Sequence, residues 1–508
     1  MNSKNTDNLV VNKADKKNLG SATAEGVFWV GGGQVLTQFI QMATAVCLAR
    51  LLLPEDFGLF GMAFVVISFS QLFADFGVGA ALVQKKIINQ EILSSCFWLN
   101  VLVGSLAALV LVLTSPLLAE FYGEVRVESI LTVLSFNLLL AGIFVVPGAI
   151  LYKGMQFAKI AKARIIGSIA GAILVVFMAW FGFGVWSLVA QPIAGSTITG
   201  ILMAKYSGWF PQWKFSWRQI RGISKFSFDV FGANLLGYLT RYADKLLVGK
   251  YLGSESLGYY SMAYQIMLYP MNQISSVIIR VLFPTLSKLQ EEMPRFRELY
   301  LKAVSTIAFV TFPMMTGLFA VSDDFILVVF GAKWLPMLPV FEVLCFIGML
   351  QSVGTTAGTI HLSTGKTREF LYLTMGLAPV TLIAFFIGKN WGILGVAIAY
   401  AIVSTTYFFV RLLVALPIAG ITITEFQKVL RATVIASLVM VICLRLVLAE
   451  ILTPFDFYPF LRLTISILVG IVIYVVGIFI LNRPLLEELT RIIMNVIRRN
   501  NRSGVVSL

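Results

Sequence analysis

Charged residues are scarce in this sequence: Asp, Glu, Lys and Arg make up only 13% of its 508 residues, whereas 58% are hydrophobic. A water-soluble domain of this length cannot bury that much apolar surface, so a soluble fold is excluded. At about 20 residues per crossing, the length provides for many membrane helices. It leaves no room for a separate soluble catalytic domain.

Histidine and cysteine are scarce as well. His361 is the only histidine, which excludes a zinc site built from several histidines and allows a Ser-His-Asp triad only through that residue. The four cysteines lie inside apolar runs without paired spacing, so we interpret them as small buried hydrophobic residues. We therefore expect no enzyme activity, no cofactor and no metal site.

About fourteen apolar runs follow one another along the chain, which predicts an all-α, polytopic membrane protein. The first run is too long for the apolar core of a signal peptide and shows no clear cleavage site, so we interpret it as a retained span. The predicted spans cover residues 26–49, 57–83, 91–115, 127–151, 160–181, 184–206, 226–249, 258–285, 303–321, 337–362, 368–388, 391–416, 430–449 and 459–481.

The distribution of cations predicts the orientation. The net charge is +14, but the cations are scattered between apolar runs rather than gathered on one basic face, so we expect no nucleic acid partner. With the N-terminus inside, most Lys and Arg fall in inner segments, as the positive-inside rule requires. We therefore expect both termini in the cytoplasm. The outer segments then carry Arg50, Arg126, Lys250, Lys333, Lys389, Arg445 and Arg462.

The sequence contains an internal repeat. Residues 50–64 align without a gap on residues 250–264, matching Glu55 with Glu255 and Gly58 with Gly258. Short apolar segments also resemble one another by chance, and the matched glutamates and glycines are what argue against chance here. Six spans separate the copies, so both run in the same direction, which predicts two pseudo-symmetric six-helix lobes with a shared site between them.

The repeat and the spans together predict the domain organisation. The N-lobe holds spans 1–6 and the C-lobe holds spans 7–12, and two further spans follow as a C-terminal addition. The expected parts are a cytoplasmic tail (1–25), the N-lobe (26–206), a cytoplasmic amphipathic linker (207–225), the C-lobe (226–416), spans 13 and 14 (417–481) and a second cytoplasmic tail (482–508).

Polar residues recur at helical spacing inside three spans. The positions of span 2 that correspond in the repeat to the polar positions of span 8 are apolar. The two halves are therefore alike in shape and unlike in charge. We expect these side chains to line a central substrate cavity. They are Gln34, Gln38 and Gln41 in span 1, Asn234, Tyr238, Arg241 and Lys245 in span 7, and Gln265, Asn272 and Arg280 in span 8.

Three cations within spans, Arg241, Lys245 and Arg280, carry most of the functional argument. Each costs roughly 2.5–3.5 kcal/mol at the bilayer centre, so they should face a wet cavity or paired anions. Asp244, Asp229 and Glu342 are the structural alternatives as ion-pair partners. A cationic cavity suits an anionic ligand, and Arg binds phosphate through two hydrogen bonds.

Two acidic residues and one surface segment complete the candidates. Asp75 and Asp244 are possible ion-coupling residues; for Asp75, a structural hydrogen bond is an equal alternative. Residues 209–225 alternate aromatic and cationic side chains, which is typical of a strip lying on membrane lipids at the inner surface.

The stretches LARLLLPEDFGLFGMA (48–63), FADFGVGAALVQKK (73–86) and ISKFSFDVFGANLLGYLTRYADKLLVGKYLGSESLGYYSMAY (223–264) resemble bacterial polysaccharide exporters of the multidrug/oligosaccharidyl-lipid/polysaccharide flippase superfamily, in the colanic-acid and lipopolysaccharide exporter branch. The likeness covers about residues 20–480 and is specific in these blocks.

The resemblance implies a flippase in the bacterial inner membrane that moves an undecaprenyl-diphosphate-linked oligosaccharide outward by alternating access. It implies that Arg241, Lys245 and Arg280 engage the diphosphate, that spans 13 and 14 shape a groove for the lipid tail, and that polysaccharide polymerase machinery is a possible partner. The alternative is an ion-coupled multidrug antiporter of the same superfamily. Such a protein should have an acidic or aromatic cavity, and the three cations argue against it.

Overall fold

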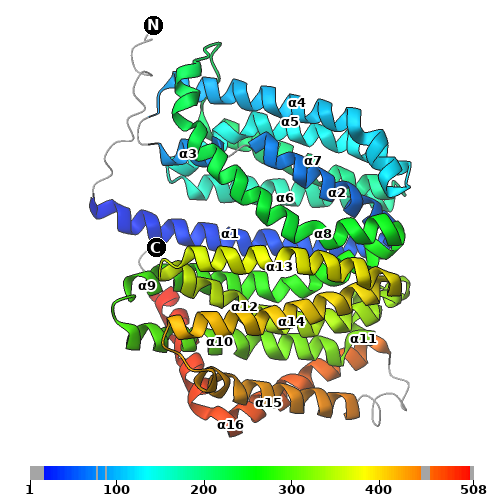
Figure 1. Ribbon diagram of the computed structural model, residues 1–508, viewed down its shortest axis with the longest axis vertical. Coiled ribbons are helices and arrows are strands. Elements are labelled where there is room, and N and C mark those ends of the chain that lie inside the picture. The colour runs from blue at the N-terminus through cyan, green and yellow to red at the C-terminus, as the bar shows by residue number, and fades with distance from the viewer. Residues whose placement is uncertain (1–15, 76–77, 86–87, 448–457, 504–508) are drawn as a thin grey trace. The chain divides into compact units, whose positions relative to one another are not determined.

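The computed structural model describes residues 16–75, 78–85, 88–447 and 458–503, and all elements in these ranges are helices (Figure 1). Contacts divide the chain into two compact units, Met1–Ser261 and Met262–Leu508, which we describe separately. The division lies within the predicted C-lobe, after predicted span 7. The predicted lobe boundaries stay a prediction.

The first unit contains seven helices and most of an eighth among the described residues. They are α1 (Lys16–Leu51), α2 (Pro54–Asp75), α3 (Val78–Gln84), α4 (Gln90–Tyr122), α5 (Arg126–Lys153), α6 (Phe157–Trp180), α7 (Val185–Ser207) and α8 (Trp217–Pro270), of which α8 continues into the second unit.

The second unit continues with long helices separated by short helical turns. They are η1 (Met271–Ser275), α9 (Ser276–Lys288), α10 (Met293–Ala320), α11 (Ser322–Val329), η2 (Ala332–Met337), α12 (Leu338–Ser363), α13 (Thr367–Gly388), η3 (Lys389–Trp391), α14 (Gly392–Ile418), α15 (Ile423–Val447) and α16 (Pro459–Ser503). The residues expected as a C-terminal tail therefore continue as helix to Ser503, after a break at Asn482.

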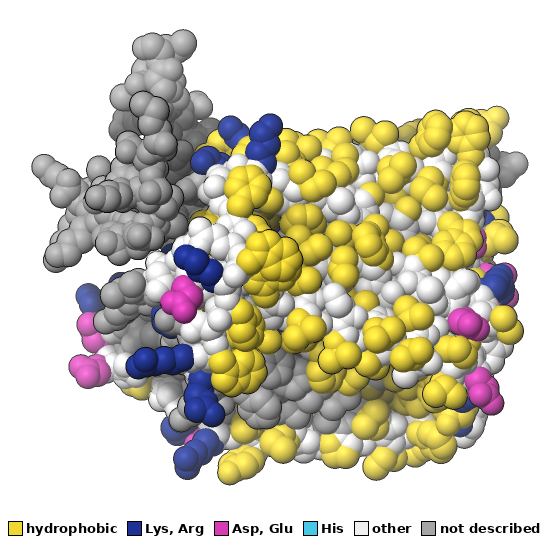
Figure 2. Space-filling view, turned by 90° about the horizontal axis from the view of Figure 1, so that it is seen from above, with side chains coloured by type: hydrophobic (Ala, Val, Ile, Leu, Met, Phe, Trp, Pro, Cys, Tyr) yellow, Lys and Arg dark blue, Asp and Glu magenta, His cyan; other side chains and the backbone are white. Residues whose placement is uncertain are grey.

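The helices are long, and they expose apolar side chains on their outer surfaces. Among the described residues, eleven stretches are long and apolar enough to cross a membrane, and one of them, Thr367–Ile418, contains both α13 and α14. Large apolar side chains such as Leu113 and Ile173 are about two-thirds exposed, as lipid-facing positions require. Figure 2 shows one face covered by hydrophobic side chains, with charged side chains gathered at its two ends. The all-α polytopic fold is confirmed. The count of fourteen spans stays a prediction because α1 is not among the eleven.

The pattern of neighbouring helices in the first unit recurs in the second. In the first unit α4 packs on α5, α5 on α7, α6 on α7, and α2 on α5. The helices that hold the corresponding predicted spans of the second unit make the same pairs: α10 with α12, α12 with α14, α13 with α14, and α9 with α12. Residues 54–207 and residues 276–418 thus pack their helices in the same order.

Two breaks interrupt the long path of α8 and its continuation. Gly253 has φ 85° and ψ 178°, a conformation that only glycine adopts readily, and it lies between predicted spans 7 and 8. Pro270 lacks the backbone N–H of a regular helix and is followed by the π-helical turn η1. The turn then continues as α9.

Ion pairs hold α15 and α16 to the rest of the second unit. Arg462 of α16 binds both carboxylate oxygens of the buried Asp324 of α11. Arg445 of α15 pairs with Glu342 of α12 at 2.9 Å. Glu342, which the sequence offered as a partner for the cavity cations, is thus used here instead. At the other end, Arg297 of α10 pairs with Glu425 at the start of α15.

The linker between α7 and α8 is an extended segment, residues 209–216, fastened to the beginning of α4. Ser94 accepts a hydrogen bond from the Gln212 N–H, and Ser95 accepts one from the Ser216 N–H. Trp98 donates to the Gln212 carbonyl and stacks on Trp213, whose side chain is 90% exposed. The segment therefore presents aromatic side chains outward from a fixed backbone.

Candidate functional site

The polar positions of α1 lie in the first unit and only partly face its interior. Gln34 and Gln38 are partly buried, and Gln41 is exposed. From α8, Tyr238 is partly buried and its hydroxyl donates to the Val65 carbonyl of α2 at 2.6 Å. Tyr238 therefore also fastens α8 to α2. The side chains of Asn234, Arg241, Asp229 and Asp75 lie outside the described residues.

Asp244 is buried within the first unit. Its carboxylate accepts hydrogen bonds from the hydroxyl of the fully buried Tyr260 at 3.0 Å and from the Lys245 backbone N–H at 2.7 Å. Tyr260 follows the break at Gly253, so this contact joins the helical segments on either side of the break. The adjacent Lys245 side chain lies over the Tyr242 ring, with Nζ 5.9 Å from the ring centroid.

The remaining predicted cavity residues belong to the second unit. Gln265 of α8, Asn272 of η1 and Arg280 of α9 are all exposed. Gln265 and Arg280 lie on either side of the π-helical turn, and Asn272 lies within it. The structure describes the two units separately, so the shared cavity stays a prediction.

A polar cluster that the sequence analysis missed lies beside this path in the second unit. Tyr400 of α14 accepts a hydrogen bond from Gln351 of α12 at 2.7 Å, and its hydroxyl lies 3.3 Å from that of Tyr264 of α8. Tyr264 directly precedes Gln265. In the sequence these residues stand isolated within apolar runs, so no spacing pattern points to them.

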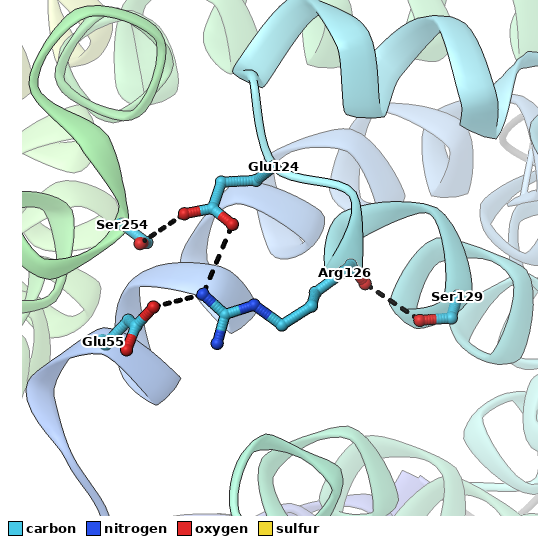
Figure 3. Close-up of polar contacts among 5 residues, drawn as sticks. All are labelled: Glu55, Glu124, Arg126, Ser129 and Ser254. Carbon is cyan, nitrogen blue, oxygen red and sulfur yellow. Dashed lines mark hydrogen bonds and ion pairs between the residues drawn. The ribbon is translucent and has the colours of Figure 1, made fainter.

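A second missed cluster lies in the first unit, at the helix ends that are predicted to face outward (Figure 3). Arg126 at the start of α5 pairs with Glu55 at the start of α2 and, at 3.4 Å, with Glu124. Glu124 accepts a hydrogen bond from Ser254 of α8 at 3.0 Å. Arg126 and Glu124 thus connect the two copies of the repeat, since Glu55 lies in one and Ser254 in the other. The sequence placed these charges outside but did not join them.

Beneath this cluster, α2 and α8 cross at very short distance. A Cβ atom on Gly58 would lie 1.6 Å from the Ser254 carbonyl oxygen, and one on Gly258 would lie 1.9 Å from the Pro54 carbonyl oxygen. Gly58 aligns with Gly258, and Pro54 with Ser254, at the same offset of 200 residues. The crossing is therefore reciprocal between equivalent positions of the repeat, like the contact about a two-fold axis.

These groups are suited to binding. The described candidates are amides, hydroxyls, buried or paired carboxylates, and cations. Together they can hold a polar or anionic ligand, as a carrier requires.

Comparison with known proteins agrees with this description. Residues 47–339 match the family profile described as "Polysaccharide biosynthesis protein". The chain is 29% identical to the teichuronic acid biosynthesis protein TuaB of Bacillus subtilis, over 88% of this chain and 93% of that protein. It is 26% identical to the lipopolysaccharide biosynthesis protein WzxC of Escherichia coli, over 75% of this chain and 78% of that protein.

Among solved structures, the chain is similar to the lipid II flippase MurJ in an inward closed conformation. The TM-score is 0.72 at 18% identity, covering 89% of this chain and 98% of that one. At this identity the similarity establishes the fold, which is MurJ-like. Since the family profile covers more than half of the sequence, the chain belongs to the polysaccharide biosynthesis protein family, and its fold is that of a multi-pass membrane protein.

Proposed function

We propose that this protein moves an undecaprenyl-diphosphate-linked oligosaccharide from the inner to the outer leaflet of a bacterial cytoplasmic membrane. The two relatives reported above are named for the biosynthesis of teichuronic acid and of lipopolysaccharide. We propose the substrate only as a chemical class, a lipid-linked oligosaccharide that bears a diphosphate.

The observation that carries the proposal is the presence of cations within membrane helices. Arg241 and Lys245 lie in α8 and Arg280 lies in α9, on one helical path that also carries the polar residues of the predicted cavity. Cations at such depth require an anion or water, and a diphosphate supplies the anion. Gln34, Gln38, Gln41, Asn234, Tyr238, Gln265 and Asn272 are proposed to bind the sugars in the same cavity.

The proposed mechanism follows from the two parts of the substrate, of which one is soluble in lipid and the other in water. The prenyl chain stays in lipid, beside α15 and α16, while the diphosphate and sugars pass through the polar cavity. We propose fourteen spans in two six-helix lobes that rock about this cavity. The recurring order of neighbouring helices supports two equivalent lobes, and the crossing at Gly58 and Gly258 is a contact that closes the outer side.

The energy source is the membrane potential, with Asp75 and Asp244 as the residues through which an ion could couple. An inside-negative potential favours outward movement of an anion by roughly 2.3 kcal/mol per charge per 100 mV. Both termini are proposed to be cytoplasmic, and the polymerase that extends the oligosaccharide is a proposed partner on the opposite side.

The second candidate, an ion-coupled multidrug antiporter, needs a cavity that attracts cationic drugs. The exposed cation Arg280 argues against that cavity. No described feature favours the antiporter over the flippase.

The test is a deletion strain complemented with wild type, Arg241→Ala, Lys245→Ala or Arg280→Ala, at matched protein levels in the membrane. Surface polymer and lipid-linked oligosaccharide trapped on the inner side are measured together. Loss of surface polymer with accumulation of precursor supports the proposal. Arg295→Ala is the control, since Arg295 is exposed at the start of α10 and pairs only with Glu292 three residues away among the described residues. Full export in all three variants would refute the proposed cationic site. Normal surface polymer in a deletion strain that has no second exporter would refute the proposed function.

A further inference from the structure

Arg411 is a cation within a membrane helix that neither the repeat nor the polar stripes single out. It lies in α14, about two turns before the last residue of that helix, Ile418, and its side chain is partly buried. This end of α14 is the one predicted to face the cytoplasm. The residue therefore lies near the predicted inner surface of the second unit.

Aromatic rings and a glycine surround the guanidinium. Its central carbon lies 5.4 Å from the ring centroid of Phe370 on α13 and 5.2 Å from that of Tyr407 on α14. A Cβ atom on Gly358 of α12 would lie 3.1 Å from Nη2, so the absence of a side chain there leaves space for the guanidinium. Three helices thus position this one cation.

The cation has no acidic partner among the described residues. No carboxylate of a described residue lies within ion-pair distance of it, and its Nε has no hydrogen-bond partner among these residues. The two rings supply a cation–π attraction, which offsets only part of the cost of removing a guanidinium from water.

A second nitrogen without a partner lies in the same cluster. His361 of α12 is fully buried, and its ring lies 5.8 Å from that of Phe370, which also contacts Arg411. Its Nδ1 lies 3.1 Å from the Ala357 carbonyl oxygen, which can only accept, so Nδ1 carries a proton. Nε2 has no hydrogen-bond partner among the described residues. Most buried polar atoms in proteins are paired, so two such nitrogens beside one ring are unusual.

We propose that Arg411 binds the phosphate group of an anionic ligand at the predicted inner end of the second unit. The guanidinium presents paired N–H donors that match two oxygens of a phosphate. Phe370 and Tyr407 hold its plane in place before the ligand arrives, so little side-chain entropy is lost on binding. Arg411 is not one of the proposed cavity cations, and the proposal does not depend on export.

Two sources could supply the phosphate, a phospholipid headgroup or a soluble or prenyl-linked diphosphate. The experiment uses the purified full-length protein in neutral detergent and follows the thermal unfolding midpoint during titration with inorganic pyrophosphate, farnesyl diphosphate or phosphatidylglycerol. Phosphatidylcholine is the zwitterionic control. A response to pyrophosphate or farnesyl diphosphate assigns a diphosphate ligand, and a response to phosphatidylglycerol alone assigns a headgroup.

The variants are Arg411→Ala, Arg411→Lys and the matched control Arg368→Ala, which removes an exposed cation from the start of α13 at the same predicted side. Losing a charged hydrogen-bonding group should weaken binding of the effective probe about 10- to 100-fold in Arg411→Ala. Arg411→Lys keeps the positive charge but loses the paired N–H donors of the guanidinium. Its affinity for the probe should lie between those of wild type and Arg411→Ala. Arg368→Ala should bind as wild type does.

Gly358→Ala is a further test, because it keeps Arg411 and narrows the space that the guanidinium occupies. It should weaken binding if the position of the cation matters. The proposal is overturned if no phosphate probe shifts the midpoint of the wild-type protein, or if the folded Arg411→Ala and Arg411→Lys proteins bind like Arg368→Ala. Export assays are not involved, so either result leaves the proposed function to its own test.

Discussion

Gly58 of α2 and Gly258 of α8 each pack against the backbone of the opposite helix, Gly58 against Ser254 and Gly258 against Pro54. Because both contacts are shorter than any Cβ atom tolerates, substitution must push the helices apart. We expect Gly58→Leu and Gly258→Leu each to destabilise the protein by about 1–3 kcal/mol, the usual effect of overpacking. Thermal unfolding in detergent measures this.

The matched control for the glycine variants lies one turn away. A Cβ atom on Gly61 would lie 3.3 Å from the end of the flexible Leu257 side chain, so Gly61→Ala should be nearly neutral. If Gly58→Leu were as stable as Gly61→Ala, the close crossing would be refuted.

The Arg126–Glu55 pair of the first unit and the Arg462–Asp324 pair of the second unit should contribute differently to stability, because their exposure to solvent differs. Arg126 and Glu55 have side chains 53% and 40% exposed, whereas those of Arg462 and Asp324 are 24% and 4% exposed. Arg462→Ala leaves a buried carboxylate unpaired and should cost about 3–5 kcal/mol. Arg126→Ala should cost less than about 1 kcal/mol, since water screens exposed pairs.

Chemical unfolding of both variants beside wild type measures this difference. Arg462→Lys is a useful control, because it keeps the positive charge but loses the bidentate hydrogen bonding to the carboxylate of Asp324. Equal destabilisation by Arg126→Ala and Arg462→Ala would contradict the structural ranking.

Trp213 should lie at the membrane interface rather than in bulk water. Its side chain is 90% exposed and stacks on Trp98, in a linker fixed to α4. A polarity-sensitive dye on Trp213→Cys, in a protein with its four native cysteines replaced, should shift to shorter wavelength on transfer to liposomes. The same dye on Gln290→Cys, an exposed turn position, should shift less. Equal emission at both positions would place the linker in water.

The membrane potential should set the rate of transport if it drives an anionic substrate. In membrane vesicles loaded with lipid-linked oligosaccharide, collapsing an inside-negative potential of 100 mV removes roughly 2.3 kcal/mol per charge of driving force. We expect the initial rate to fall several-fold. An unchanged rate would exclude the potential as the source of energy.

Composition and the order of apolar runs were enough to predict the membrane fold, because lipid demands long apolar helices. The repeat aligned Gly58 with Gly258 but did not predict that the two glycines lie in one helix crossing, which the structure adds. Contacts across distant helices could not be predicted. Nothing near Arg126 in the sequence indicates Glu55, and nothing near Arg411 indicates Phe370. Such neighbours are set by how helices pack, for which the sequence carries no local pattern.

The attachment of α15 and α16 has a consequence for shortened chains. A protein ending after Ile418 would keep Asp324 and Glu342 but lose Arg462 and Arg445, the cations that neutralise them. Two carboxylates would then stand without counter-charges at the edge of an apolar helix bundle, and Arg297 would lose Glu425 at the other edge. The remainder, which ends with α14, would lack these ion pairs, and we expect its insertion and quality control in the cell to suffer before any loss of transport is detected.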